Sequence, residues 1–564
     1  MFKTNFSFCI FISLLFTQLL LTSCAANQPV VQQENNSEEE DSIVVFTKPK
    51  LVVGIVVDQM RYDYLIRFWD RYGEDGFKRM VTAGYNLKNA HYNYMPTFTA
   101  PGHASIYTGT TPRNHGVIGN SFYDKSIGEK VVPVENDTVL SLGTEGDAGK
   151  RSPKYLLAST FGDENRLATQ FRGKTIGIAL KDRGAVLPAG HAANAAYWFY
   201  GDDDEGNFIS SSYYNDELPN WVENFNNSGK IDSYIDTWET LYPISTYIES
   251  GPDDSEFEGD LAGQKTFPYD LEALKDDKYG YGILAYTPFG NSIVTDFSLA
   301  AIDGEQLGED QYTDVLAISY SSPDYIGHKF GVNAKETQDN YLRLDQEIAR
   351  LLKRLDEKVG KGNYTVFLTA DHAGVHVPSY LQSKNISGGY FSNKELRAAL
   401  RTYTEEKYQS DSIIAAVSNF QVFFNYEELK RKDINRKELE DDLYNFLLEY
   451  PKIAKVYTRH MLENSSFTDM IGERVKDGFN AKRSGDVAYV LEPSVISYPR
   501  YGSTHGSPYS YDAHVPMIFY GKGINKGQSG KYAEIIDIAP TISALLGISF
   551  PSASTGEVLY EVID

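Results

Sequence analysis

The chain has 564 residues, of which 41% are hydrophobic, 13% aromatic and 23% charged. This composition fits one large enzyme domain with insertions, or two to three ordinary domains, and excludes collagen, coiled coil and disorder as the main architecture. The net charge of -24 disfavours a nucleic-acid-binding surface, so an anionic substrate needs a local cationic site, most simply bound metal. Because both cysteines, Cys9 and Cys24, lie within the first 24 residues, the rest of the chain has no disulfide, cysteine nucleophile or thiolate metal site.

The N-terminal segment has the pattern of an export signal. Lys3 precedes an apolar run from Phe6 to Leu21 that is short for a stable membrane span, and residues 1–23 are predicted to be a signal peptide. The run ends in Leu-Thr-Ser-Cys, which resembles a bacterial lipobox and implies lipidation of Cys24; an ordinary secretory peptide with a chance cysteine is the alternative. Residues 24–47 are polar and acidic, as in a flexible tether. We therefore expect an exported periplasmic or cell-envelope lipoprotein that meets the membrane only through Cys24.

Short apolar runs predict the strands of an α/β fold. Continuous apolar runs without alternation are typical of strands covered on both faces, so we expect a largely parallel central sheet flanked by helices. The runs are Leu51–Val57, Thr175–Leu180, Val315–Tyr320, Tyr364–Thr369 and Val515–Tyr520.

Between these strands, the clearest helix spans about Glu336 to Val359, where apolar residues recur every three or four positions up to a C-cap at Gly360. The stretch from Gly201 to Asp310 lacks strong periodicity and indicates a loop-rich insertion or cap, placed at roughly residues 185–310 of a catalytic domain over residues 48–564. Residues 394–470 alternate helix-like and strand-like patterns.

Polar side chains gather directly after four of the strands. In open α/β sheets, ligands bind beyond the carboxyl ends of the strands, because loops from different strands converge there. A single aspartate in that position more often caps a helix than binds a ligand. Seven such groups together favour a shared site; they are Asp58, Lys181, Arg183, Asp324, His328, Asp371 and His372.

These residues suit a metal centre. Without cysteine, a hydrolytic zinc site takes imidazole nitrogen and carboxylate oxygen. Asp324 and His328 are four residues apart and share one helical turn, and His505 lies in a Gly/Ser-rich loop before the last strand. Asp371 and His372 are adjacent, so their side chains are expected to point apart and could serve two metals. Two metals about 4 Å apart use roughly this many ligands and are typical of phosphoryl transfer.

The nucleophile must then be serine or threonine. The segment Tyr94–Gly109 offers Thr97, Thr99 and Ser105, and Thr99 is predicted at a helix N-terminus, where free N–H groups favour a phosphoryl group. The alternative is that Thr99 only caps this helix.

Seven motifs in order, from about Lys50 to Leu559, resemble the alkaline phosphatase superfamily and, more closely, its phosphate-irrepressible, threonine-nucleophile bacterial alkaline phosphatases. The motifs are V-V-D-Q-M-R-Y-D-Y, P-T-F-T-A-P-G-H-A-S, H-G-V-I-G-N, K-D-R, P-D-Y-I-G-H, T-A-D-H-A-G and T-H-G-S. This resemblance implies an alkaline-phosphatase-like fold, two Zn2+ per chain and hydrolysis of small phosphate monoesters through a phosphothreonine intermediate.

The resemblance also implies a role for each residue. Thr99 becomes the phosphorylated nucleophile, and Asn120, Lys181 and Arg183 contact the non-bridging oxygens of the phosphate. One zinc is held by Asp324, His328 and His505. The other is held by Asp58, Asp371, His372 and the Thr99 oxygen.

Lys181 and Arg183 decide the expected substrate class. Residues i and i+2 on an extended segment project to the same side, so both cations can meet one ligand. Together with the Asn120 amide they suit the dianion of a monoester and leave little room for the second ester group of a diester. Two alternatives stay open: a nucleotide pyrophosphatase/phosphodiesterase of the same superfamily, which in the family's pattern lacks this cationic pair, and a non-catalytic lipoprotein that binds phosphorylated ligands.

Overall fold

A computed structural model describes residues 48–201, 206–275 and 279–563 of the chain. The segment Lys48–Asp564 forms one compact unit. The predicted signal peptide, Cys24 and the acidic tether lie outside the described residues. None of the described helices is both long and apolar enough to cross a membrane.

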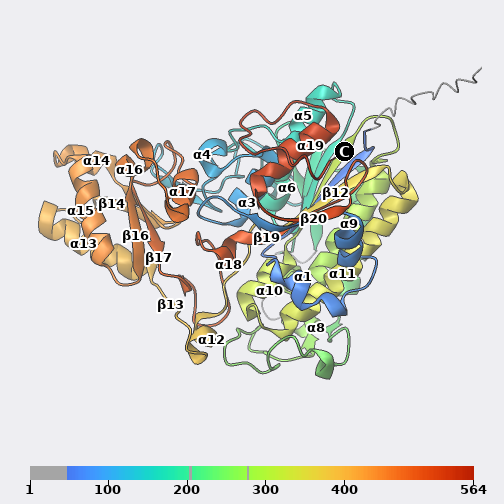
Figure 1. The fold of residues 1–564 in the computed structure, drawn as a ribbon, viewed down its shortest axis with the longest axis horizontal. Coiled ribbons are helices and arrows are strands. Elements are labelled where there is room, and N and C mark those ends of the chain that lie inside the picture. Colours follow the sequence, from blue (N-terminus) through green and yellow to red (C-terminus); the bar gives the residue numbers. More distant parts are fainter. Residues whose placement is uncertain (1–47, 202–205, 276–278, 564) are drawn as a thin grey trace, which may run out of the picture. The chain divides into compact units, whose positions relative to one another are not determined.

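A mixed sheet of ten strands forms the centre of this unit (Figure 1). Its strand order is β20-β2-β19-β12-β1-β11-β6-β7-β8-β5. The five strands in the middle run parallel, and nearly all of their residues are buried, as the apolar runs predicted for all but the last strand named next. They are β12 (Tyr364–Thr369), β1 (Leu51–Val57), β11 (Asp314–Tyr320), β6 (Thr175–Ala179) and β7 (Ala195–Tyr200).

The last predicted strand runs antiparallel to both of its neighbours in the sheet. β19 (His514–Gly521) pairs antiparallel with β12 and with β2 (Tyr85–His91), and β2 in turn pairs parallel with β20 (Gly527–Glu534). Thr369 at the end of β12 faces Met517 near the start of β19. The loop that enters β19 therefore lies at the sheet edge where the parallel strands end, although β19 itself does not end there.

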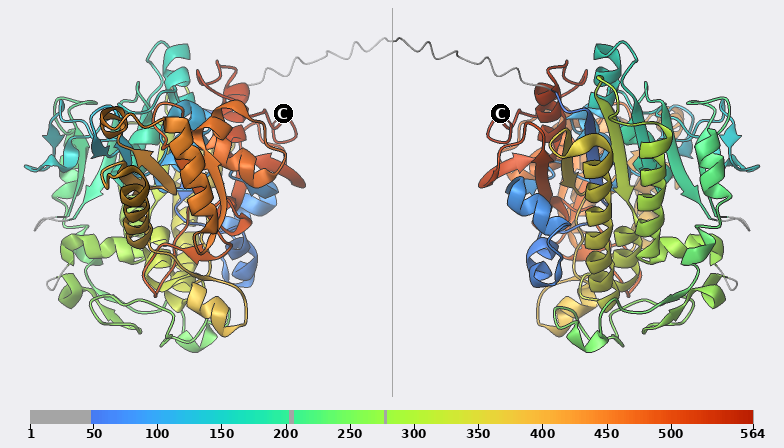
Figure 2. Two further views of the ribbon diagram at one scale, coloured as in Figure 1. Left: turned by 90° about the vertical axis from the view of Figure 1, so that its left-hand side faces the viewer. Right: turned by 90° about the vertical axis from the view of Figure 1, so that its right-hand side faces the viewer.

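Helices cover both faces of the sheet. On one face, α9 (Phe289–Gly304) packs against α11 (Lys335–Leu355), with α3 (Thr99–Thr108), α6 (Asp182–Ala189) and α19 (Ile538–Leu546) on the other (Figure 2). α11 confirms the predicted amphipathic helix, with Leu344, Ile348 and Leu351 fully buried. After Leu355 the helix continues as a π-helical turn over Asp356–Gly360, and Gly360 has φ +94°.

The predicted insertion is partly sheet. β7 and β8 (Asn207–Ser211) belong to the central sheet, although both fall within the expected boundaries of roughly 185–310. Between β8 and α9 the described residues form short elements, including β9 (Thr237–Trp238), β10 (Tyr269–Asp270) and α8 (Leu271–Leu274).

A second hydrophobic core lies in the segment between β12 and β19. Its four-stranded sheet has the order β14-β15-β17-β16, with α13 (Asn393–Tyr408) and α15 (Arg436–Glu449) packed nearby, at the left of Figure 1. The strands are β14 (Ile414–Ser418), β15 (Gln421–Phe424), β16 (Ile453–Thr458) and β17 (Val487–Leu491). Alternating patterns in residues 394–470 indicated these elements without showing that they form a core of their own.

Candidate active site

Six side chains converge at the carboxyl edge of the parallel strands and form two groups of three. Within each group, one possible ligand atom per residue lies within 4.8 Å of the others. One group consists of Asp324, His328 and His505, and the other of Asp58, Asp371 and His372.

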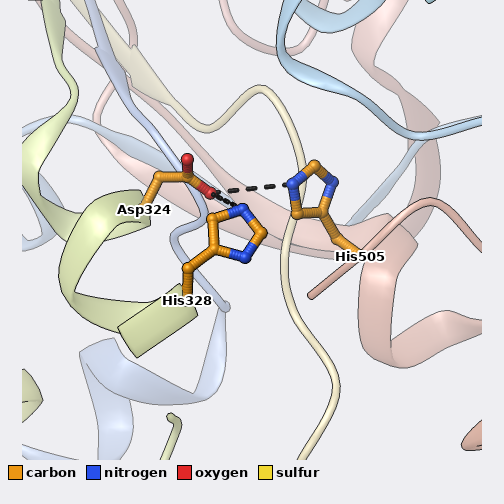
Figure 3. A group of neighbouring side chains, drawn as sticks. All are labelled: Asp324, His328 and His505. Carbon is orange, nitrogen blue, oxygen red and sulfur yellow. Dashed lines mark ion pairs between the residues drawn. The ribbon is translucent and has the colours of Figure 1, made fainter. Parts of the chain in front are cut away.

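The first group is built on one helix and one loop (Figure 3). Asp324 and His328 lie one turn apart in α10 (Ser322–Phe330), and His328 Nε2 is 3.1 Å from Asp324 Oδ1. His505 Nε2 approaches the same oxygen at 3.6 Å. Two imidazole nitrogens and a carboxylate oxygen thus face a common point, which is a ligand set suited to a divalent ion such as zinc.

The second group follows β1 and β12 and is completely buried. His372 Nε2 lies 3.4 Å from Asp58 Oδ1 and 3.6 Å from Asp371 Oδ2. The expectation that Asp371 and His372 point apart is wrong. The chain after β12 is no longer a regular strand, so adjacent side chains can turn toward one point.

The two groups are neighbours. The rings of His372 and His505 stack with centroids 3.4 Å apart, one ring from each group. Lys181 Nζ lies 2.5 Å from Asp58 Oδ2 and 2.5 Å from Asp324 Oδ2, so its ammonium group bridges the two groups. Burial lowers the pKa of Lys181, but the charges of Asp324 and Asp58 outweigh it and raise this pKa above its usual value.

Hydrogen bonds orient each imidazole through its Nδ1 atom. The Nδ1 atoms of His328, His372 and His505 lie 2.7 Å, 3.0 Å and 2.7 Å from backbone carbonyl oxygens. A carbonyl can only accept, so each Nδ1 carries a hydrogen, and in the neutral imidazole each Nε2 then has a lone pair for a metal ion. This is the usual second-sphere arrangement of metal-binding histidines.

The electrostatics of the second group fit a bound cation. Asp58 Oδ1, Asp371 Oδ2 and His372 Nε2 are buried and have no hydrogen-bond partner among the described residues. Burial, and then the charge of Asp324, raise the pKa of Asp58 to about 6. Burial and the charge of Asp58 raise the pKa of Asp371 well above its usual range. Carboxylates crowded this closely in a dry site require positive charge, and divalent metal ions supply it.

Thr99 begins α3 and lies near both groups. The preceding Thr97 carbonyl accepts from His505, while His103 Nδ1 lies 2.9 Å from the Thr99 carbonyl oxygen and 3.4 Å from Asp371 Oδ2. A Cβ on Gly102 would come within 2.3 Å of the Asp371 carbonyl oxygen, so glycine allows the first turn of α3 to approach this closely.

Among the three candidate hydroxyls, two are engaged in the described structure. Thr97 donates to the Ser507 carbonyl at 3.2 Å, and Ser105 pairs with His115 at 2.9 Å. The Thr99 hydroxyl has no hydrogen-bond partner among the described residues and does not cap α3 with its side chain. The alternative role as a side-chain cap is therefore excluded for the described structure.

The cationic pair differs from its predicted geometry. Lys181 is the N-cap of α6 and Arg183 lies in its first turn, so they do not share an extended segment. Both charges nevertheless lower the pKa values of Tyr325 and His103, so Lys181 and Arg183 lie in one region. Arg183 Nε is buried without a partner, and the side chain is 25% exposed, so it can still reach a ligand.

Asn120 is oriented by the start of α3. Its Oδ1 accepts from the Ala100 backbone N–H at 2.8 Å, which leaves the Nδ2 hydrogens as donors for an anion. A free amide donor beside a helix N-terminus favours a phosphoryl oxygen.

Gln59 is a site residue that the sequence motifs did not single out. Its Nε2 donates to Asp324 Oδ1 at 2.6 Å and its backbone N–H donates to Asp371 Oδ1 at 3.1 Å, so it links the two groups. Its φ of +62° is unusual for a residue other than glycine. Its place directly after Asp58 was the only signal in the sequence.

Several known proteins resemble this chain in sequence and in fold. The family model for type I phosphodiesterase / nucleotide pyrophosphatase matches residues 52–514. The chain is 44% identical to "Calcium-transporting ATPase" of Myroides odoratus and to "Alkaline phosphatase PafA" of Elizabethkingia meningoseptica, each over 92% of this chain and 95% of the relative. A crystal structure of wild-type alkaline phosphatase PafA superimposes with a TM-score of 0.89 at 43% identity, covering 92% of this chain and 99% of that one.

Proposed function

The chain belongs to the type I phosphodiesterase / nucleotide pyrophosphatase family, within the alkaline phosphatase superfamily, and we propose that it hydrolyses phosphate monoesters with Thr99 as nucleophile and two bound zinc ions. It is an enzyme of the alkaline phosphatase type, a phosphoric monoester hydrolase that releases inorganic phosphate. The observation that supports the mechanism is the pair of adjacent three-residue groups with the start of α3 beside them.

Zinc fits both groups by donor type. One ion is assigned to Asp324, His328 and His505, and the other to Asp58, Asp371, His372 and the Thr99 oxygen. When bound, such ions supply Lewis acidity that lowers the pKa of a coordinated hydroxyl or water and stabilises charge on a departing oxygen.

The chain's own residues then carry the phosphoryl group. Thr99 Oγ1 loses its proton to solvent and attacks phosphorus, the bond from phosphorus to the ester oxygen breaks, and that oxygen takes up a proton from solvent and leaves as the alcohol. Water then attacks the phosphothreonine from the side that the alcohol vacated, which releases phosphate and restores the Thr99 hydroxyl. Throughout both steps, the Asn120 amide, the Lys181 ammonium and the Arg183 guanidinium hold the non-bridging oxygens.

The same cations favour a monoester over a diester. A monoester presents two negative charges on three non-bridging oxygens, whereas a diester presents one charge and a second substituent. Arg183 has a buried nitrogen without a partner and a partly exposed side chain, so it is available to a dianion. Lys181 bonds to Asp58 and Asp324 in the described structure, and we expect it to reach the dianion when bound metal ions neutralise these two carboxylates. The family includes phosphodiesterases, which makes diester hydrolysis the alternative to be tested.

We also propose that the enzyme is exported and anchored to the cell envelope through lipid on Cys24. The support is the apolar leader ending in Leu-Thr-Ser-Cys and the acidic tether behind it. Replacing Cys24→Ser is expected to release the activity from the membrane fraction, and unchanged membrane association would contradict the anchor.

Trapping the phosphoenzyme tests the nucleophile. Acid quenching during turnover of a radiolabelled monoester is expected to leave label on Thr99, located by peptide mapping. Thr99→Ala should abolish the label and lower kcat/KM by about 10⁴-fold or more. Ser105→Ala removes a hydroxyl from the same helix and should retain both label and activity. Label on another residue, or full activity of Thr99→Ala, would refute the mechanism.

A further inference from the structure

A cavity beside the catalytic site has two phenylalanines in its wall. Its volume is about 300 Å³, and its lining includes His505 of the first metal group, Phe98, Phe420 and Asn419. The rings of Phe98 and Phe420 stack with centroids 6.1 Å apart and planes inclined by 21°, and the Phe98 ring meets His505 edge-on at 5.6 Å. A cavity of about 150 Å³ is enough for benzene, so this one has room for a ring and a short linker.

The cavity adjoins three parts of the catalytic site. Phe98 directly precedes Thr99, and His505 is a candidate metal ligand. Asn419 Nδ2 donates to the Ser121 carbonyl at 2.7 Å, so the tip of the hairpin between β14 and β15 is attached to the residue that follows Asn120. A phosphoryl group held by Thr99 and Asn120 therefore has this cavity next to it.

The hairpin tip has an unusual backbone at Phe420. Asn419 and Phe420 are the two central residues of the turn between Ser418 and Gln421, with φ of +54° and +59°. Such turns favour glycine at the second position, because a side chain there is strained. Backbone strain that the surrounding structure maintains is common at functional sites. Here the strained residue contributes a phenyl ring to the cavity.

Gly506 allows the loop of His505 to pack against both rings. Its φ is +120°, and a Cβ at this position would come within 2.6 Å of Phe98 Cε1 and 3.0 Å of Phe420 Cε2. Phe98 and Phe420, which come from distant segments of the chain, are thus held together against this loop. We refer to these two residues as the aromatic wall.

We propose that the aromatic wall binds an aromatic ring in the leaving group of the substrate, so that monoesters of ring-bearing alcohols are preferred. The inference rests on the proposed function. There, Thr99 is assigned to one three-residue group, so an ester oxygen that leaves in line with its attack lies on the side of the other group, which includes His505. From that oxygen, the cavity is the adjacent space.

The lining of the cavity fits a neutral aromatic group. A ring that packs against Phe98 or Phe420 gains apolar burial and a stacked or edge-to-face contact. None of the described residues that line the cavity is lysine or arginine, so a leaving group with further negative charge finds no cation there. Asn419 and Ser418 add polar groups at one side, as in ligand pockets that are mostly apolar.

Two alkyl monoesters with similar leaving alcohols test the site. Phenethyl phosphate carries a ring that ethyl phosphate lacks, so the ratio of their kcat/KM values reports contacts of the ring rather than the ease of breaking the ester bond. The wild-type enzyme is expected to prefer phenethyl phosphate by about tenfold or more, and Phe420→Ala should lower this preference by about fivefold or more. The affinity for phenethylphosphonate, which has no ester bond to break, should fall by a similar factor when measured by calorimetry.

Two further variants separate the role of the ring from its effect on the fold. Phe420→Leu keeps an apolar side chain at the same backbone position, so it should lower the preference by a smaller factor, about two- to threefold. Phe171→Ala is the matched control, because Phe171 also has a positive φ, +64°, but is exposed and does not line the cavity. This variant should retain the full preference.

The outcomes distinguish this inference from the proposed function. Equal kcat/KM values of the wild-type enzyme for the two esters would leave the monoesterase function intact and overturn the aromatic leaving-group site. A preference that Phe420→Ala retains, or that Phe171→Ala loses to the same extent, would also overturn it. Hydrolysis of neither ester would refute the monoesterase function and this inference with it.

Discussion

Substituting the cationic pair tests the basis of substrate choice. Arg183→Ala is the cleaner change, because the ion pair of Arg183 is with Asp182, outside the two candidate metal groups, whereas Lys181 lies 2.5 Å from both Asp58 and Asp324. Its guanidinium is partly exposed at the start of α6, and its buried Nε has no partner. Losing this side chain removes a donor to the substrate and leaves the metal ligands in place.

The expected fall in kcat/KM follows from the charge on the substrate. A charge-assisted hydrogen bond contributes about 1.5–3 kcal/mol, and each 1.36 kcal/mol is tenfold in rate, so Arg183→Ala should lower kcat/KM for a monoester by about 10- to 150-fold. A diester has half the negative charge, so its kcat/KM should fall by roughly the square root of that factor, about 3- to 12-fold. The monoester preference should therefore fall by about 3- to 12-fold, and by more in the Lys181→Ala/Arg183→Ala double variant.

The assay compares kcat/KM for an aryl phosphate and for the matching methyl aryl diester. Metal content is measured in parallel, so that a loss of metal in the double variant is not mistaken for a loss of discrimination. Lys174→Ala is the matched control, because this lysine precedes the other end of β6 and bonds to Glu305. A monoester preference retained in the double variant would refute the argument that these cations set the substrate class.

Three further results are expected. Lys181→Met should lower the unfolding free energy of the metal-free enzyme by about 3–5 kcal/mol, because Asp58 and Asp324 lose their cation. Chemical denaturation should show a smaller loss in the metal-loaded enzyme. Equal losses in the two forms would contradict the bridging role of Lys181. Gln59→Ala removes the 2.6 Å hydrogen bond to Asp324 and should raise the rate of metal loss to a chelator by about 10- to 100-fold. An unchanged rate of metal loss would exclude Gln59 as a positioning residue. Burial raises the pKa of Glu534 to about 7, so the folded state holds a proton that the unfolded state has released, and stability falls as pH rises from about 4.5 to 7. Glu534→Gln should flatten that part of the Tm profile, and parallel profiles would show that Glu534 does not cause the slope.

The sequence alone was sufficient for much of the architecture. Local apolar runs predicted β1 and β12 with their observed bounds and α11 nearly so, because strands buried on both faces and amphipathic helices leave a direct periodic pattern. The direction of β19 left no such pattern, since a buried strand looks the same in either orientation. The second core between β12 and β19 was also not predicted, because a hydrophobic cluster depends on contacts between elements rather than on the pattern within one element.

The sequence likewise predicted part of the candidate site, and the rest became visible only in the tertiary structure. Residue type and position after the strands were enough to select five of the six acid and imidazole side chains, because the ends of parallel strands share one edge of the sheet. His505 was selected from its Gly/Ser-rich loop before the last predicted strand. Only the tertiary structure decided that Asp371 and His372 face one point, that Lys181 bridges both groups, and that Gln59 links them. Those facts depend on side-chain direction and on distances across strands far apart in the chain, which no local pattern contains.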